Sequence, residues 1–178
     1  AKNIKMKKIR RLIVSFGSVV LLMATFTVRS DSSLERGDQL KAVYLFNFTK
    51  YIRWPDSSFE SKSEKISICV DAPAVFREFL GEIINNKRVG KAQQLLEVVS
   101  LDVAVDCELI YLVKRDNKLP ITLNNSVIVT DSGDNYFPET EIKFYILDKK
   151  LRFEIDLDKF KKKNITVSSE LLKLAKIK

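Results

Sequence analysis

Histidine and cysteine, two residue types that often perform catalysis or hold metal ions, are scarce in this chain of 178 residues. Histidine is absent, which excludes Ser-His and Cys-His nucleophiles, histidine metal ligands and the usual proton shuttle near neutral pH. The two cysteines, Cys69 and Cys107, cannot form a standard zinc site by themselves. The sequence therefore predicts no metal centre and no nucleophile of these kinds.

Carboxylates are the remaining groups that could act as a general acid and base. Asp102 and Asp106 form one closely spaced pair, and Asp131 and Asp134 form another. Acidic residues in polar stretches are more often solvated turn formers, so we assign no catalytic residue among them. The five glycines have neither the spacing of a dinucleotide fingerprint nor that of a phosphate loop. We therefore expect no enzyme and no cofactor.

Residues 1–30 have the composition of an export signal. A basic stretch without acids, which contains six Lys and Arg residues up to Arg11, precedes an apolar run over residues 12–28. We expect cleavage near residue 30 and a working domain over residues 31–178. The alternative is an uncleaved anchor, because the run approaches the roughly 20 residues that span a bilayer.

This segment also carries most of the excess positive charge. It holds seven of the 31 basic residues and none of the 23 acidic ones, so the net charge falls from +8 to +1 without it. A nucleic-acid partner loses its main support, and we expect none. A basic cluster remains at Lys159 and residues 161–163, for which we predict a solvated helix face. The remaining length suits one ordinary domain.

Export would place Cys69 and Cys107 in a compartment where thiols are oxidised. A single intramolecular disulfide is then the natural hypothesis. The alternative is two buried free cysteines, since cysteine packs well as a small apolar residue.

The first element of the domain is predicted to be a helix over residues 33–54, ended by Pro55. Its apolar residues recur at spacings of three and four, which indicates one buried face. These residues are Leu40, Val43, Tyr44, Phe48, Tyr51 and Ile52. Leu45, Phe46 and Trp54 widen the apolar stripe, which would permit contact with a partner or a second copy. The alternative is a helix buried within its own domain.

The rest of the chain predicts a sheet with helices. Strands are expected near residues 66–70, 95–100, 108–113 and 127–130, with a helix over 75–84 after the first of them. Alternating residues then predict an antiparallel hairpin over 142–146 and 151–155. A short helix over 157–162 and a last helix from Ser168 or Ser169 to Ile177 follow. The fold class is therefore α/β: a mixed sheet flanked by helices, with a C-terminal antiparallel hairpin and a terminal helix.

Several motifs in order resemble the YfiR family of bacterial exported regulatory proteins over residues 38–177. They are LKAVYLFNF at 40–48, Trp54-Pro55, Ile68-Cys69-Val70, Cys107 before a strand, VIVTD at 127–131, RFEID at 152–156 and SSELLKLA at 168–175. The resemblance implies a periplasmic α/β protein, often a homodimer. It would repress an inner-membrane GGDEF diguanylate cyclase by binding its periplasmic part, and so tune cyclic di-GMP and biofilm formation. The family's bridging cysteines fall on Cys69 and Cys107.

The polar members of these motifs are the candidates for a pocket or a partner surface. Asn47 in an apolar helix stretch and Glu154 in the hairpin need hydrogen-bond partners if buried, so each would either pin the fold or line a small ligand pocket. The full candidate set is Phe46, Asn47, Trp54, Arg152, Glu154, Ser168 and Ser169. The alternative function is an exported protein that binds a small molecule and serves another sensor or an uptake system.

Overall fold

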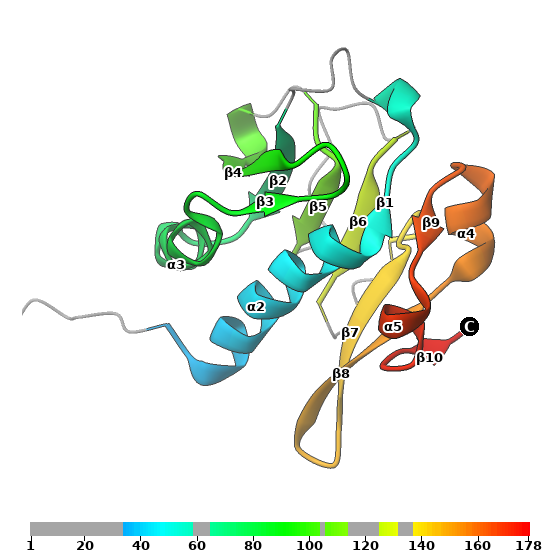
Figure 1. The fold of residues 1–178 in the computed structure, drawn as a ribbon. Helices are drawn as coiled ribbons and strands as arrows, with labels where there is room; N and C mark the ends of the chain where they lie inside the picture. The colour runs from blue at the N-terminus through cyan, green and yellow to red at the C-terminus, as the bar shows by residue number, and fades with distance from the viewer. Residues whose placement is uncertain (1–33, 59–64, 104–105, 114–124, 132–136) are drawn as a thin grey trace, which may run out of the picture. The chain divides into compact units, whose positions relative to one another are not determined.

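The computed structural model describes residues 34–58, 65–103, 106–113, 125–131 and 137–178. Residues from 33 onward belong to one compact unit. The expected export signal over residues 1–30 lies outside the described residues, as does Asp134. The described chain forms a mixed α/β fold with an eight-stranded sheet, as the sequence predicts (Figure 1).

Five parallel strands form the middle of this sheet. In spatial order they are β4 (Gln94–Ser100), β2 (Ile66–Asp71), β5 (Leu109–Leu112), β6 (Val127–Thr130) and β7 (Ile142–Leu147). The predicted hairpin is confirmed, because β8 (Lys150–Ile155) pairs antiparallel with β7 and places Phe144 opposite Phe153. Beyond these lie β10 (Lys176–Ile177), parallel to β8, and β3 (Arg88–Val89), antiparallel to β4.

The two faces of the sheet bury different sets of residues. Every residue of β5 and β6 is buried, as expected for central parallel strands that are covered on both faces. One face packs against the four described helices: α2 (Arg36–Tyr51), α3 (Ala74–Ile84), α4 (Leu157–Lys162) and α5 (Ser169–Leu172). The other face holds a smaller cluster that includes both cysteines and Ile110.

The first helix ends earlier and faces differently than predicted. It stops at Tyr51, and the next residues form β1 (Ile52–Arg53), which pairs antiparallel with β9 (Thr166–Val167). Pro55 disfavours helical geometry just before it, and the pairing with β9 draws Ile52 into the core.

The exposed side of α2 also differs from the prediction. Leu40 and Val43, expected in the core, are 45% and 40% exposed, whereas Ala42, Leu45 and Phe48 are fully buried. The exposed residues and the buried residues of this helix are both apolar at helical spacing. The periodicity therefore did not decide which of the two sides meets the sheet.

The predicted terminal helix is much shorter than expected. α5 ends at Leu172, and residues 176–177 instead form β10 beside β8, with the Lys178 amide donating to the Ile155 carbonyl at 3.0 Å. This pairing covers an edge of β8 that would otherwise expose its backbone groups.

Candidate functional site

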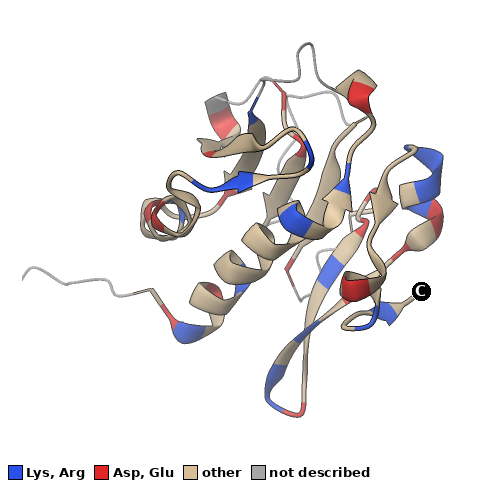
Figure 2. Cartoon of the chain, in the orientation of Figure 1, with Lys and Arg blue, Asp and Glu red and all other residues tan. Residues whose placement is uncertain are grey.

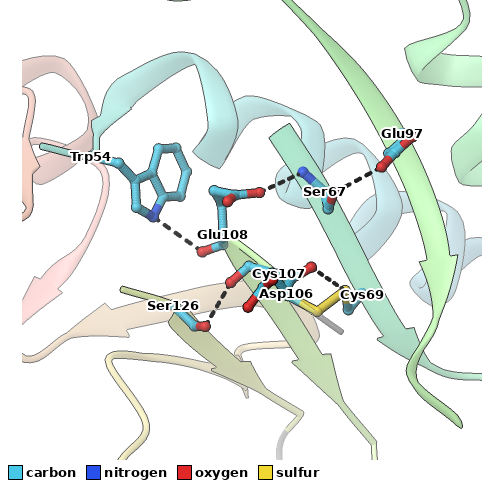
Figure 3. Close-up of a disulfide and its surroundings, with 8 residues drawn as sticks. All are labelled: Trp54, Ser67, Cys69, Glu97, Asp106, Cys107, Glu108 and Ser126. Atoms are coloured by element: carbon cyan, nitrogen blue, oxygen red, sulfur yellow. Dashed lines mark hydrogen bonds between the residues drawn. A yellow bond between two sulfur atoms is a disulfide. The ribbon is translucent and has the colours of Figure 1, made fainter. Parts of the chain in front are cut away.

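A disulfide joins Cys69 of β2 to Cys107 just before β5 (Figure 3). The two Cα atoms lie 5.8 Å apart, and both side chains are buried with Leu101 and Ile128 on the face opposite the helices. The predicted bridge is therefore present, and the alternative of two free cysteines is wrong. The bond ties the middle of β2 to the residues just before the neighbouring parallel strand β5.

Hydrogen bonds from Trp54, Ser126 and Ser67 hold the residues around Cys107. The indole N–H of Trp54 donates to the Glu108 carbonyl at 3.1 Å, and the hydroxyl of Ser126 donates to the Cys107 carbonyl at 2.6 Å. The Glu108 carboxylate accepts the Ser67 amide at 2.7 Å (Figure 3). Trp54, a candidate surface residue by sequence, is 8% exposed and lies in the core.

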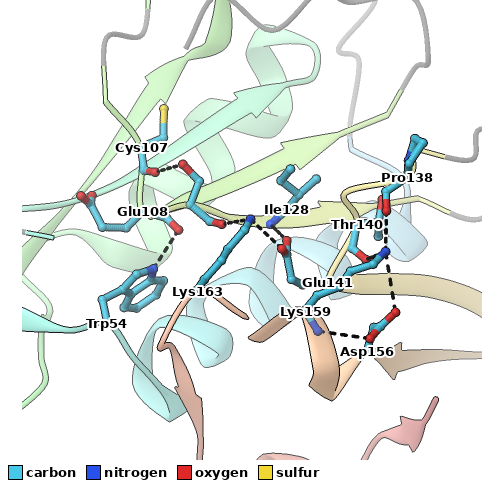
Figure 4. A network of polar contacts seen from close by, with 11 residues as sticks. Trp54, Cys107, Glu108, Ile128, Pro138, Thr140, Glu141, Asp156, Lys159 and Lys163 are labelled. Atoms are coloured by element: carbon cyan, nitrogen blue, oxygen red, sulfur yellow. Dashed lines mark hydrogen bonds and ion pairs between the residues drawn. The ribbon is translucent and has the colours of Figure 1, made fainter. Parts of the chain in front are cut away.

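A buried ion pair links α4 to the loop before β7 (Figure 4). The Lys163 Nζ lies 2.6 Å from Oε1 of Glu141, whose side chain is 1% exposed. The same lysine donates to the Ser126 carbonyl at 2.8 Å, and Oε2 of Glu141 accepts the Ile128 amide at 2.7 Å. Burial raises the pKa of Glu141 above its ordinary value, although Lys163 and the Ile128 amide favour the charged form.

Lys159 makes a second set of contacts from α4. Its ammonium donates to the carbonyls of Pro138 and Thr140 and lies 3.7 Å from the Asp156 carboxylate. The prediction that this basic cluster is a solvated helix face is therefore wrong for Lys159 and Lys163. Both ammonium groups donate hydrogen bonds to backbone carbonyls that come earlier in the chain. Lys161 and Lys162 of the cluster are exposed.

Glu154 lines a small cavity beside this network. The cavity measures about 30 Å³, which has room for roughly one water molecule and not for an organic ligand. Glu154 also pairs with Lys176 of β10 at 3.5 Å. This carboxylate thus holds the edge strand beside the hairpin.

A third polar cluster lies at the carboxyl end of β6. The Lys41 Nζ of α2 contacts Asp131 at 2.6 Å and Asp38 at 2.9 Å, and the Tyr111 hydroxyl lies 3.5 Å from Asp131. Burial by itself would lower the pKa of Lys41, but the two carboxylates outweigh it and raise that pKa. Burial and the Asp131 charge raise the pKa of Tyr111.

This third cluster was not predicted from the sequence. The sequence suggested Asp131 and Asp134 as a pair, and the structure pairs Asp131 with Lys41, 90 positions away. The available signal was an aspartate that directly follows a buried strand, since the carboxyl ends of parallel strands are the usual place for polar sites.

The remaining candidates occupy separate places. Phe46 and Asn47 are half-buried on α2 beside the exposed Leu40 and Val43. Arg152 is exposed on β8. Ser168 precedes α5, where its carbonyl accepts the Leu171 and Leu172 amides, and the exposed Ser169 begins that helix.

A comparison with known protein families matches residues 38–176 to the YfiR/HmsC-like family. The chain belongs to this family. At family level it is a periplasmic regulator of diguanylate cyclase, which agrees with the resemblance seen in the sequence. A comparison with curated proteins finds no match. Within the described residues of this YfiR/HmsC-like chain, no helix has the length and apolar character needed to cross a membrane.

Proposed function

We propose that this protein represses an inner-membrane GGDEF diguanylate cyclase by binding the cyclase's periplasmic part, and that it acts without catalysis. The observation that carries the proposal is the family match over residues 38–176, which covers nearly all of the compact unit. Residues 1–30 act as the cleaved export signal in this proposal, and residues 31–178 as the periplasmic domain.

The exposed side of α2 supports a docking role. Leu40 and Val43 are large apolar residues with 45% and 40% of their surface exposed, and the half-buried Phe46 and Asn47 continue the same side of the helix. Acidic and basic residues are interspersed over the described elements, but residues 42–49 in the middle of α2 carry no charge (Figure 2). Exposed apolar surface of this kind is typical of an interaction site.

The tip of the β7–β8 hairpin adds exposed apolar residues at the same end of the sheet. Ile146 and Leu147 are 59% and 53% exposed. The contact between Lys41 and Asp131 places the first half of α2 at the carboxyl end of β6. Strand β7 runs parallel to β6 and ends at Leu147, so the hairpin tip extends beyond that same end (Figure 1). We call Leu40, Val43, Ile146 and Leu147 the apolar docking residues.

Deleting the gene tests the proposal directly. Loss of a repressor should raise the cellular concentration of cyclic di-GMP and increase biofilm, and the intact gene should restore both. The purified protein should also bind the periplasmic part of a diguanylate cyclase encoded beside it. An unchanged cyclic di-GMP concentration together with no binding would contradict the proposal.

Mass spectrometry of the exported protein tests cleavage near residue 30, and sedimentation tests whether the protein forms the homodimer that is expected of the family.

A further inference from the structure

The outer edge of β4 is open along most of its length. Strand β3 pairs with β4 only at Gln94 and Leu95, whereas β4 continues to Ser100. On its inner side, β4 pairs with β2 over all of residues 96–100. No strand in the part of the chain that the structure describes pairs with the outer side of those five residues. Alternate residues there direct backbone N–H and C=O groups outward, which is a template for another strand.

A groove of about 480 Å³ lies beside this open edge. Its floor is β4 itself, where Leu96 and Val98 are in register with Ile66 and Ile68 and so point to the helix side of the sheet. Its wall is α3, from Arg77 to the residues just after Ile84. A volume of several hundred Å³ is typical of sites that bind a ligand of more than a few atoms.

Gly81 leaves the middle of the helix wall without a side chain. A Cβ placed there would meet no heavy atom within 4 Å, so packing within the described chain does not require glycine at this position. Glycine inside a helix is less favourable than alanine. A glycine that faces open space in a groove permits another backbone to approach the helix closely.

The charges of the groove are unevenly compensated. Lys65 at one end pairs with Glu97 at 2.9 Å, and Glu97 also accepts the Ser67 hydroxyl. The half-buried Arg77 lies toward the other end and donates to the Ala72 carbonyl. Among the described residues its guanidinium has no carboxylate partner within ion-pair distance, although the exposed Glu78 also lines the groove. A carboxylate brought by a ligand would complement Arg77.

We propose that this groove binds an extended peptide segment of a partner protein, which pairs with residues 96–100 as an additional strand. The segment carries apolar side chains at alternate positions, which enter the groove, and an acidic residue that meets Arg77. About five residues, roughly 16 Å of extended chain, match the open length of β4. The site is separate from the apolar docking residues, so it does not depend on how the cyclase binds.

A second copy of this chain fits the groove less well than a free segment does. The residues of a second β4 that would have to enter the groove are Leu96 and Val98, and the copy's own α3 already packs over them. Pairing between two β4 edges would therefore leave the groove unfilled.

Titration of the isotope-labelled protein with a defined peptide tests the proposal. The probe is the capped hexapeptide Thr-Val-Thr-Val-Thr-Asp, followed by amide chemical shifts and hydrogen exchange. We expect saturable shifts at residues 96–100 and along α3, with slower exchange of the outward amides of β4. Replacing the central threonine of the peptide by proline should abolish the shifts, because proline lacks an N–H for the ladder.

Two protein variants separate peptide binding from loss of structure. Gly81→Phe fills the groove from a position that faces open space and should abolish peptide shifts while the thermal midpoint stays near that of Gly81→Ala. Arg77→Ala should weaken binding about tenfold, and the Asp-to-Asn peptide should show the same loss. Absence of saturable shifts at millimolar peptide, or equal shifts with the proline peptide, would overturn the proposal. Protection of the β4 amides that rises with protein concentration alone would assign the edge to a second copy instead.

Discussion

The ammonium of Lys163 lies 2.6 Å from the carboxylate of Glu141, a residue with 1% of its side chain exposed, and so joins α4 to the loop before β7. Removing one partner of such a buried pair leaves an uncompensated charge. We expect Lys163→Met to lower the free energy of unfolding by about 3 kcal/mol at pH 7, measured by urea denaturation.

The pH dependence of this loss identifies the carboxylate as its cause. Burial raises the folded-state pKa of Glu141 above the unfolded value of 4.5, so its contribution to stability falls as the pH rises from 4.5 through the folded-state pKa. The cost of Lys163→Met should therefore shrink as the pH is lowered toward 4.5. The double variant Lys163→Met with Glu141→Gln should lose less than Lys163→Met alone. An equal loss at pH 5 and pH 8 would contradict this interpretation.

The disulfide between Cys69 and Cys107 closes a sequence separation of 38 residues. Constraint of the unfolded chain by a loop of this length corresponds to about 4 kcal/mol in the chain-entropy estimate. Replacing both cysteines by alanine should lower the free energy of unfolding by about that amount. A reductant should destabilise the natural protein and leave the double alanine variant unchanged. If reductant alters both proteins equally, the bridge is not the source of the effect.

Trp54 is the single tryptophan of the chain, so its fluorescence reports on β1 and the start of β5. Trp54→Phe removes the N–H that the buried Glu108 carbonyl accepts, and we expect a loss of about 1–3 kcal/mol in unfolding free energy. Emission from Trp54 should be blue-shifted in the folded protein and move to longer wavelength on unfolding. Tyr145→Phe, at a half-buried aromatic residue of β7, serves as the matched control and should cost less.

Alkaline pH should destabilise the protein through the cluster at Asp131. The folded-state pKa of Lys41 and that of Tyr111 are both raised, so the folded protein holds these two protons more tightly than the unfolded chain does. The free energy of unfolding should fall as the pH rises above 10, where both groups lose protons in the unfolded chain. Asp131→Asn should flatten this fall, since Asp131 favours the protonated form of each group. Parallel stability curves for the two proteins between pH 9 and 11 would refute the assignment.

Charge on the exposed side of α2 should disrupt docking without unfolding the domain. We expect Leu40→Asp and Val43→Asp each to weaken binding to the cyclase's periplasmic part at least tenfold and to raise cyclic di-GMP in cells. Leu174→Asp is the control, because Leu174 is 64% exposed and lies outside the apolar docking residues. If Leu40→Asp and Val43→Asp bind the cyclase's periplasmic part as tightly as the natural protein does, α2 is excluded as the docking surface.

Local patterns predicted most of the individual elements. The apolar run at 127–129, followed by Thr130, becomes β6, and the alternation on either side of Asp148 and Lys149 becomes the β7–β8 hairpin. These signals are local, because burial on two faces requires consecutive apolar residues and burial on one face requires alternate ones. The two-residue strands β1, β3, β9 and β10 were not predicted, since pieces so short carry no period of their own.

The sequence by itself determined the absence of histidine chemistry, the α/β class and where the principal strands lie along the chain. Composition is read directly from the sequence, and local periodicity depends on neighbouring residues alone. Only the tertiary structure decided which apolar row of α2 meets the sheet, and so leaves Leu40 and Val43 exposed. It also decided that Lys41 meets Asp131 and that Lys163 meets Glu141. Such pairs join distant segments, and packing selects each partner from many residues of suitable charge.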